Sequence, residues 1–153
     1  LYTFSTMNRF IAAFSEMMRE YGSLTEFVRQ SVNDAKCISA VEAITSWFAA
    51  RGIEGVIPKN IQSSCKRVCM FMRWMVRSDS PVDLGLWSDI IDRRTLIMPM
   101  DTHVVQQSMR LNLLASSSTS MSAAQRLTSA MSLVFPDDPL KGDFALFGYG
   151  VNN

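Results

Sequence analysis

Apolar residues recur at every third or fourth position through most of the chain, which is the spacing of residues on one face of an α-helix. The first clear run comprises Phe10, Ile11, Phe14, Met17 and Met18. No pair of alternating apolar and polar stretches indicates a β-hairpin. The pattern therefore predicts an all-α fold, a compact array of seven or eight short helices with tight connections.

Helix-capping residues and glycines divide this pattern into elements. Gly22 is followed by Ser23, and Glu26 lies three residues further on, which is a helix stop and then a capping box. Gly52 is the expected stop of the third helix. The predicted helices after the first cover about residues 23–32, 39–52, 64–78, 86–91, 101–114, 120–135 and 140–148.

Three of the later helices have recognisable N-caps, because Ser and Asp side chains can accept hydrogen bonds from the free backbone N–H groups of a first turn. The expected caps are Ser64, Asp101 and one of two serines, Ser120 or Ser122. The stretch "SDSPVDLG" is a predicted turn, since its proline and glycine interrupt a helix. The stretch "RRTLIMPM" is expected to be extended, because a proline biases the residue before it away from helix.

The size and composition of the chain fit one folded domain, residues 1–153, since domains of about 100 to 150 residues are the commonest. Apolar residues make up 48% and charged residues 19%, and no apolar run reaches the roughly 18 residues of a membrane span. We expect a soluble protein without membrane contact. No signal peptide or targeting presequence is visible, which predicts a cytoplasmic location. The chain begins with Leu1, and we expect an N-terminal segment to be missing.

Cysteine and histidine are too scarce for a metal site. The chain has three cysteines and one histidine, whereas structural zinc sites and iron–sulfur clusters need about four such ligands. Cys65 and Cys69 lie on one helical face without a histidine, which favours reduced thiols. We expect no metal and no other cofactor. The net charge of +1 gives no overall attraction to nucleic acid, so any DNA contact must come from a local patch.

Three stretches place polar residues at helix boundaries: "SSCKR" at 63–67, "PMDTHV" at 99–104 and "DFALFGYG" at 143–150. Together they resemble the helix-hairpin-helix DNA glycosylases, whose catalytic aspartate lies in a V-D-T-H-V type segment at the start of a helix, after a helix that begins with a lysine. The longer motifs "CKRVCMFMRWMVRSDSPVDLGLW", "PMDTHV" and "DPLKGDFALFGYG" are similar to a family of bacterial proteins of unknown function over nearly the whole of residues 1–151.

Within the glycosylase superfamily the chain looks most like the archaeal 8-oxoguanine glycosylases, which have about the same lysine-to-aspartate separation as Lys66 and Asp101, 35 residues apart. The resemblance implies a helix-hairpin-helix glycosylase-like fold, Lys66 and Asp101 as catalytic residues, no iron–sulfur cluster, and double-stranded DNA with a damaged base as the partner. The glycine hairpin L-P-G-V-G of the superfamily is absent, and "PKNIQSSCK" stands in its place. The resemblance therefore does not extend to DNA-backbone binding by that hairpin.

The position of Lys66 favours a reactive amine. In the first turn of a helix the positive end of the helix dipole disfavours an ammonium group, and so does the neighbouring Arg67. Attack on a sugar carbon requires the neutral amine, and a lysine beside other cations is a known way to obtain it. The alternative is that Lys66 extends its side chain into solvent without a chemical role.

Asp101 is placed to serve both as a helix cap and as a catalytic carboxylate. Backbone N–H groups of about His103 and Val104 would hold the carboxylate ionised and fixed. Such a group can stabilise an oxocarbenium-like sugar or activate an attacking amine. The structural alternative is capping alone. His103 is interpreted as a helix-end residue and not as a base.

A basic stripe is expected along the helix that begins near Lys66. Lys66, Arg73 and Arg77 fall at positions i, i+7 and i+11 of one face, and Arg67 adjoins it. The stripe predicts contacts of Arg67, Arg73 and Arg77 with DNA phosphates, or else the solvated side of an amphipathic helix.

The stretch "DFALFGYG" places Asp143 and Phe147 one helical turn apart on the same face. They could present a carboxylate and an aromatic ring to a flipped base, as the similar D-x-x-L-W-x-x-G segment of the archaeal enzymes implies. Packing in the core is the alternative for Phe147, and it is the expected role of Trp47 and Trp74.

The leading hypothesis is a DNA repair glycosylase, with AP lyase activity possible, that removes a damaged purine such as 8-oxoguanine. The rival is a non-catalytic nucleic-acid-binding or scaffold protein with a degenerate glycosylase fold. The near-neutral charge and the missing glycine hairpin favour the rival. A position of Lys66 and Asp101 on opposite sides of the molecule would exclude the enzyme.

Overall fold

The computed structural model of the protein describes residues 2–53 and 55–152. Within them the chain forms seven α-helices and one 3₁₀-helix, and the sole β-type pairing is an isolated antiparallel bridge between Ser63 and Ser120. The helices are α1 (Phe4–Tyr21), α2 (Leu24–Ser31), α3 (Cys37–Ala50), α4 (Lys66–Val76), η1 (Arg93–Thr95), α5 (Thr102–Arg110), α6 (Met121–Val134) and α7 (Lys141–Asn152). The prediction of an all-α fold is confirmed.

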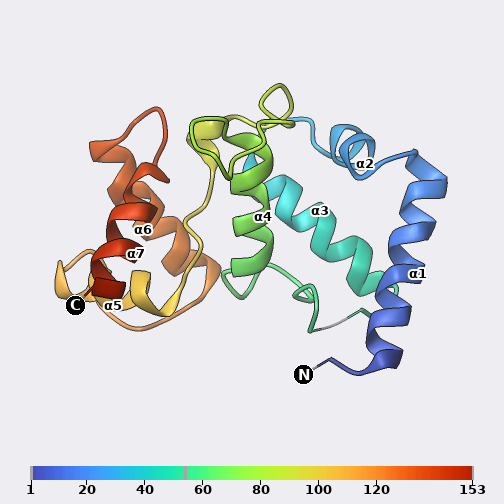
Figure 1. Cartoon of the computed structure of the whole chain (residues 1–153), viewed down its shortest axis with the longest axis horizontal. Coiled ribbons are helices and arrows are strands. Elements are labelled where there is room, and N and C mark those ends of the chain that lie inside the picture. Colours follow the sequence, from blue (N-terminus) through green and yellow to red (C-terminus); the bar gives the residue numbers. More distant parts are fainter. Residues whose placement is uncertain (1, 54, 153) are drawn as a thin grey trace.

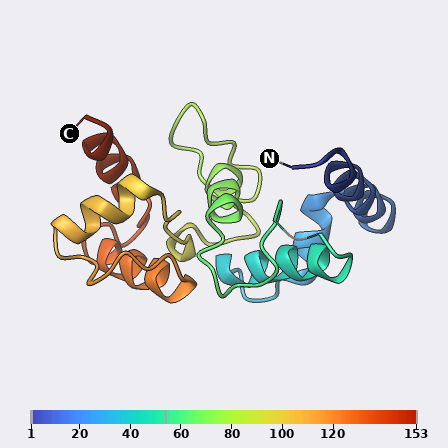
Figure 2. The same cartoon turned by 90° about the horizontal axis from the view of Figure 1, so that it is seen from below.

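Helix α4 lies between two groups of helices (Figure 1). Helices α1, α2 and α3 lie on one side of it and α5, α6 and α7 on the other, and the turned view in Figure 2 shows the same division. Contacts run from α1 to α2, from α2 to α3 and from α3 to α4, while α5 packs against α7. Helix α4 is therefore the element from which side chains can reach both groups.

The core is one continuous cluster of buried apolar side chains that includes residues from both groups. Helix α3 contributes Ala40, Val41, Ile44 and Phe48 to it. The segment 96–100 between η1 and α5 is extended and buried, and the N–H group of Met98 donates to Thr128 Oγ1 of α6 at 2.9 Å. None of the helices in the described residues combines the length and hydropathy of a membrane span.

The predicted helix over residues 86–91 is wrong, because these residues form consecutive turns. The N–H group of Trp87 donates to the carbonyl of Met75 at the end of α4 (2.7 Å), so α4 holds the backbone at the start of this segment. The Trp87 side chain is fully buried, and its Nε1 donates to Thr25 Oγ1 at 2.9 Å. Packing of this indole against α2 and α4 thus determines the local path.

The start of α4 also differs from the prediction, since Ser64 is not its N-cap. The N–H group of Ser64 donates to the carbonyl of Thr119 (2.8 Å), which ties the segment before α4 to the segment before α6. The N-cap is Cys65, in a left-handed conformation with φ 48° and ψ 39° and without a side-chain capping bond. Pairing with a distant segment therefore replaces the local capping that the sequence suggested.

The other predicted caps are confirmed. Ser23 Oγ accepts a hydrogen bond from the N–H group of Glu26 (3.0 Å), and Asp101 Oδ1 accepts one from the N–H group of His103 (3.0 Å). Of the two candidate serines, Ser120 caps α6 by accepting from Ala123. These bonds fix where the three helices begin, and one of them fixes the Asp101 carboxylate.

Candidate functional site

Lys66 and Asp101 meet although they begin different helices. Lys66 is the first residue of α4, and Asp101 is the N-cap of α5. Lys66 Nζ donates to Asp101 Oδ2 at 2.5 Å, while the other carboxylate oxygen accepts the N–H group of His103. The Lys66 side chain is 47% exposed and that of Asp101 is 22% exposed. The amine and carboxylate predicted from the sequence therefore form one pair at the protein surface.

The charge state of this pair follows from its contacts. Partial burial raises the pKa of Asp101, but the hydrogen bonds from Lys66 and from the His103 backbone outweigh it and lower the pKa below the ordinary value. Lys66 and Asp101 therefore form an ion pair, with 2.5 Å between Nζ and Oδ2. The sequence-based expectation of a reactive amine, which rested on the helix dipole and on Arg67, did not include this carboxylate as a partner of Lys66.

We predict that Asp101→Asn loses the ion pair but keeps the helix cap, because asparagine caps helices as well as aspartate. The pair is partly exposed, so at neutral pH the variant is expected to be less stable by up to about 1 kcal/mol. A carboxyl group whose pKa is lowered in the folded state stabilises the protein at a pH above its pKa in the unfolded state, which is roughly 3.9. This stabilisation is lost as the pH falls. The difference between the two proteins, measured by urea unfolding, should therefore begin to shrink as the pH falls below about 4 and vanish only below the lowered folded-state pKa of Asp101; a difference that persists at still lower pH would contradict it.

A cavity of about 540 Å³ opens beside this pair. It is lined by Met70, Arg73, Trp74, Val82, Asp101, Asp143, Phe144 and Phe147. It therefore brings together three of the four predicted catalytic and substrate-binding residues, Asp101, Asp143 and Phe147, and the fourth, Lys66, bonds to Asp101. A larger hollow of about 650 Å³ lies elsewhere, around residues 88–94, and contains none of the four.

Asp143 and Phe147 both come from α7 and differ in exposure. Asp143 is buried, and burial raises the pKa of its carboxyl group against the attraction of Arg73 and Arg77. Phe147 is 44% exposed and meets the ring of His103 edge-on, with 5.8 Å between centroids. Core packing is therefore the wrong interpretation of Phe147, and also of the similarly exposed Trp74, whereas Trp47 does pack against the core. The exposed rings form part of the cavity wall.

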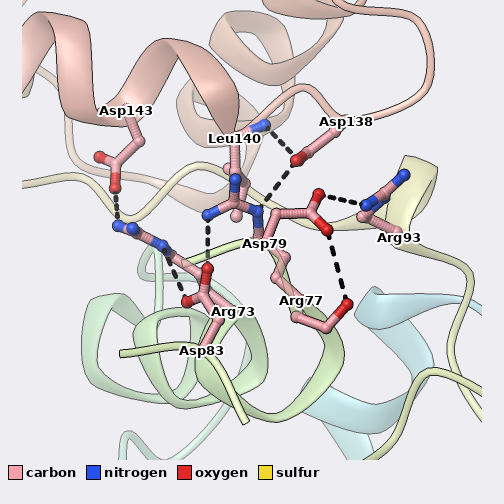
Figure 3. A network of polar contacts seen from close by, with 9 residues as sticks. Arg73, Arg77, Asp79, Asp83, Arg93, Asp138, Leu140 and Asp143 are labelled. Atoms are coloured by element: carbon pink, nitrogen blue, oxygen red, sulfur yellow. Dashed lines mark hydrogen bonds and ion pairs between the residues drawn. The ribbon is translucent and has the colours of Figure 1, made fainter. Parts of the chain in front are cut away.

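Arg73 and Arg77, predicted to lie on an exposed basic stripe, are buried in an ion-pair network (Figure 3). Arg73 pairs with Asp143 of α7, and its Nε lies 3.9 Å from Asp83 Oδ1. Arg77 donates to Asp138 Oδ2 and to Asp83 Oδ2, both at 2.9 Å. The solvated-face interpretation is wrong for both arginines. A contact with DNA phosphates would require these pairs to break, so we leave Arg73 and Arg77 out of the surface proposed to contact DNA.

Arg67 remains exposed but is not free of contacts. Its Nη1 donates to the carbonyls of Gly55 (2.9 Å) and Val56 (3.3 Å), and its guanidinium lies over the Tyr2 ring at 5.7 Å from the centroid. These contacts hold the connector between α3 and α4 against α4. The predicted contact of Arg67 with DNA stays a prediction.

Sequence reasoning missed four residues that shape this site. Asp83 and Asp138 hold the two arginines, and Phe144 and Trp74 line the cavity. The two aspartates stand in proline-containing turn segments, "SPVDLG" and "PDDPL", which gave no sign of burial. Phe144 directly follows Asp143, but helical spacing relates Asp143 to Phe147 instead. Only the fold places Phe144 at the cavity.

The sequence matches one family profile over nearly its whole length. A family profile with the description "Protein of unknown function (DUF2400)" matches residues 1–152. No curated protein and no solved structure matches the chain. The cavity and the Lys66–Asp101 pair lie within the matched residues.

Proposed function

We propose that this chain, which belongs to the DUF2400 family, is a DNA repair glycosylase with AP lyase activity that acts on a damaged purine such as 8-oxoguanine. The observation that carries the proposal is the contact of Lys66 Nζ with Asp101 Oδ2, 2.5 Å apart, beside a cavity lined by aromatic side chains. An amine, a carboxylate and a largely apolar cavity large enough for a base are the parts that such an enzyme requires. The resemblance of the sequence motifs to helix-hairpin-helix glycosylases agrees with these roles.

The cavity is the proposed site of a base turned out of the duplex. Enzymes that act on a base remove it from the stack and hold it between apolar and aromatic side chains. Phe144 and Phe147 supply such rings, and Asp143 supplies a hydrogen-bond acceptor. The deoxyribose of that nucleotide would then lie at the mouth of the cavity, where Asp101 and its partner Lys66 stand.

The proposed chemistry begins with a proton transfer within the ion pair. Lys66 gives a proton to Asp101 and becomes a neutral amine, which attacks C1′ of the deoxyribose. The Nζ–C1′ bond forms as the bond from C1′ to the base breaks, and the base leaves with the bonding electrons and takes up a proton. The C1′–O4′ bond then opens as the nitrogen loses its remaining proton and O4′ takes one up, which gives an imine and a 4′-hydroxyl group. Removal of a C2′ proton then expels the 3′ phosphate and breaks the strand, with Asp101 moving the protons.

The rival function is nucleic-acid binding without catalysis. Two observations favour it: the amine of Lys66 is engaged in an ion pair with Asp101, and the burial of Arg73 and Arg77 reduces the positive surface that DNA would meet. Covalent chemistry distinguishes the two functions, because a binding protein forms no bond to the sugar.

Borohydride trapping tests the proposal. The purified protein is incubated with duplexes that contain 8-oxoguanine, an abasic site or no lesion, and borohydride reduces any imine to a stable amine. We expect a covalent adduct with the two lesion duplexes, attached to the tryptic peptide that contains Lys66. An adduct on neither duplex, with binding retained, would leave the rival.

A further inference from the structure

Phe144 of α7 lines the cavity together with Arg73, whose guanidinium lies against one face of the Phe144 ring. The guanidinium carbon of Arg73 is 3.9 Å from the ring centroid. Arg73 itself is buried and held by its ion pair with Asp143, so it cannot move aside without breaking that pair. Phe144 is nevertheless 49% exposed and borders the cavity. One face of the ring is thus covered by a fixed cation, and the rest of the ring is available to a ligand.

A cation on one face of an aromatic ring changes what binds to the other face. The ring carries negative charge density on its faces, which the guanidinium attracts towards itself. The opposite face becomes poorer in electrons and stacks more strongly on a ring that is rich in electrons. The carboxylate of Asp143 partly offsets this field, but the guanidinium is the charge in contact with the ring.

The other aromatic side chains of the cavity lack this arrangement. Phe147 meets the neighbouring His103 edge-on, at an interplanar angle of 86°. Trp74 lines the cavity at the last turns of α4, and no cation is recorded against its ring within the described residues. Phe144 is therefore the ring in this wall that combines an exposed surface with a fixed cation against one of its faces.

We propose that Phe144, backed by Arg73, is the stacking surface of the cavity and selects electron-rich planar rings, namely guanine and its 8-oxo derivative, over adenine and thymine. Guanine is the most electron-rich of the ordinary bases, and oxidation at C8 makes it richer still. The inference rests on the proposed function for the origin of the ring, a base turned out of DNA. The preference itself is a property of the cavity and does not require the covalent step.

Binding of free 2′-deoxynucleosides tests the inference without catalysis. The titrations use 8-oxo-2′-deoxyguanosine, 2′-deoxyguanosine, 2′-deoxyadenosine and thymidine, and follow the quenching of Trp74 emission in the same cavity. The Trp74→Phe protein identifies which part of the signal comes from Trp74, because Trp47 and Trp87 also emit. The wild-type protein is expected to bind the two guanine nucleosides at least several-fold more tightly than the other two.

The variant Phe144→Leu keeps an apolar side chain but removes the ring. Since base stacking on an aromatic side chain contributes about 1–3 kcal/mol, affinity for 8-oxo-2′-deoxyguanosine should fall roughly 5- to 150-fold. The preference for guanine nucleosides should fall with it. Phe144→Tyr, which keeps the ring over Arg73, is expected to retain both. Phe4→Leu is the matched control, because Phe4 is exposed on α1 away from the cavity.

The outcomes separate this inference from the proposed function. Unchanged affinity in Phe144→Leu, or an equal loss for all four nucleosides, would overturn the selection of electron-rich rings. A lysine adduct on damaged DNA in the same protein would then leave the glycosylase proposal intact. Conversely, a Phe144-dependent preference for guanine nucleosides without any adduct would support the cavity assignment and exclude the enzyme.

Discussion

Replacing Lys66 by alanine is expected to abolish the borohydride-trapped adduct on abasic and 8-oxoguanine duplexes, to less than about a thousandth of the wild-type yield. The reason is that Lys66 Nζ is the amine in contact with Asp101 at the cavity, so its loss removes the nucleophile itself. The side chain is half-exposed, and its removal should leave the fold intact. Adduct yield is measured by gel shift over time, alongside the unfolding midpoint of each protein.

Lys36→Ala is the matched control for this experiment. Lys36 also stands at the start of a helix, as the N-cap residue of α3, and it pairs with Asp34 at 3.8 Å. It lies outside the cavity lining, so its replacement removes the same charge from a similar setting without touching the site. Equal adduct yields in Lys66→Ala and the wild-type protein would show that another amine reacts, and the roles assigned to Lys66 and Asp101 would fail together.

The positions of Lys66 and Asp101 at the starts of two helices could be predicted because they depend on local sequence, whereas the meeting of the two side chains was implied only by the resemblance to glycosylases. The capping role of Asp101 follows from its position before an apolar helical run, and it places the carboxylate at the mouth of α5. The predicted position of Lys66 in the first turn of a helix is confirmed, although the N-cap of that helix is Cys65 and not Ser64. That cap could not be predicted, since the pairing of Ser64 with Thr119 joins segments far apart in the chain.

The burial of Arg73 and Arg77 could not be predicted from their spacing. A helical face shows which side chains point the same way, but not what covers them. Here three carboxylates from two connecting segments and from α7, namely Asp83, Asp138 and Asp143, converge on the arginines. The same convergence positions Phe144 over Arg73 and so builds the cavity wall. The stripe that was expected to contact DNA instead connects α4 to the C-terminal group of helices.

Arg77→Met is expected to lower the free energy of unfolding by about 3–5 kcal/mol, because removing one partner of a buried ion pair leaves its counter-charges without compensation. Arg77 is bonded to Asp83 and Asp138, whose carboxylates are both fully buried. Arg73 approaches Asp83 only at 3.9 Å and has no recorded contact with Asp138. Methionine fills a similar volume, so the loss of unfolding free energy reports the missing charge and not an empty space left in the core. Urea unfolding followed by circular dichroism measures the difference.

The control for this variant is Arg93→Met, which removes an arginine from an ion pair at the surface. Arg93 binds Asp79 at 2.5 Å, but the two side chains are 37% and 45% exposed, so a loss within about 1 kcal/mol is expected. Similar losses of unfolding free energy in the two variants would contradict a buried network.

The network also connects to the cavity through α7. Asp138 Oδ1 accepts a hydrogen bond from the Leu140 N–H group just before α7. Loosening of the network should therefore displace α7, and with it Phe144 and Phe147, from the cavity.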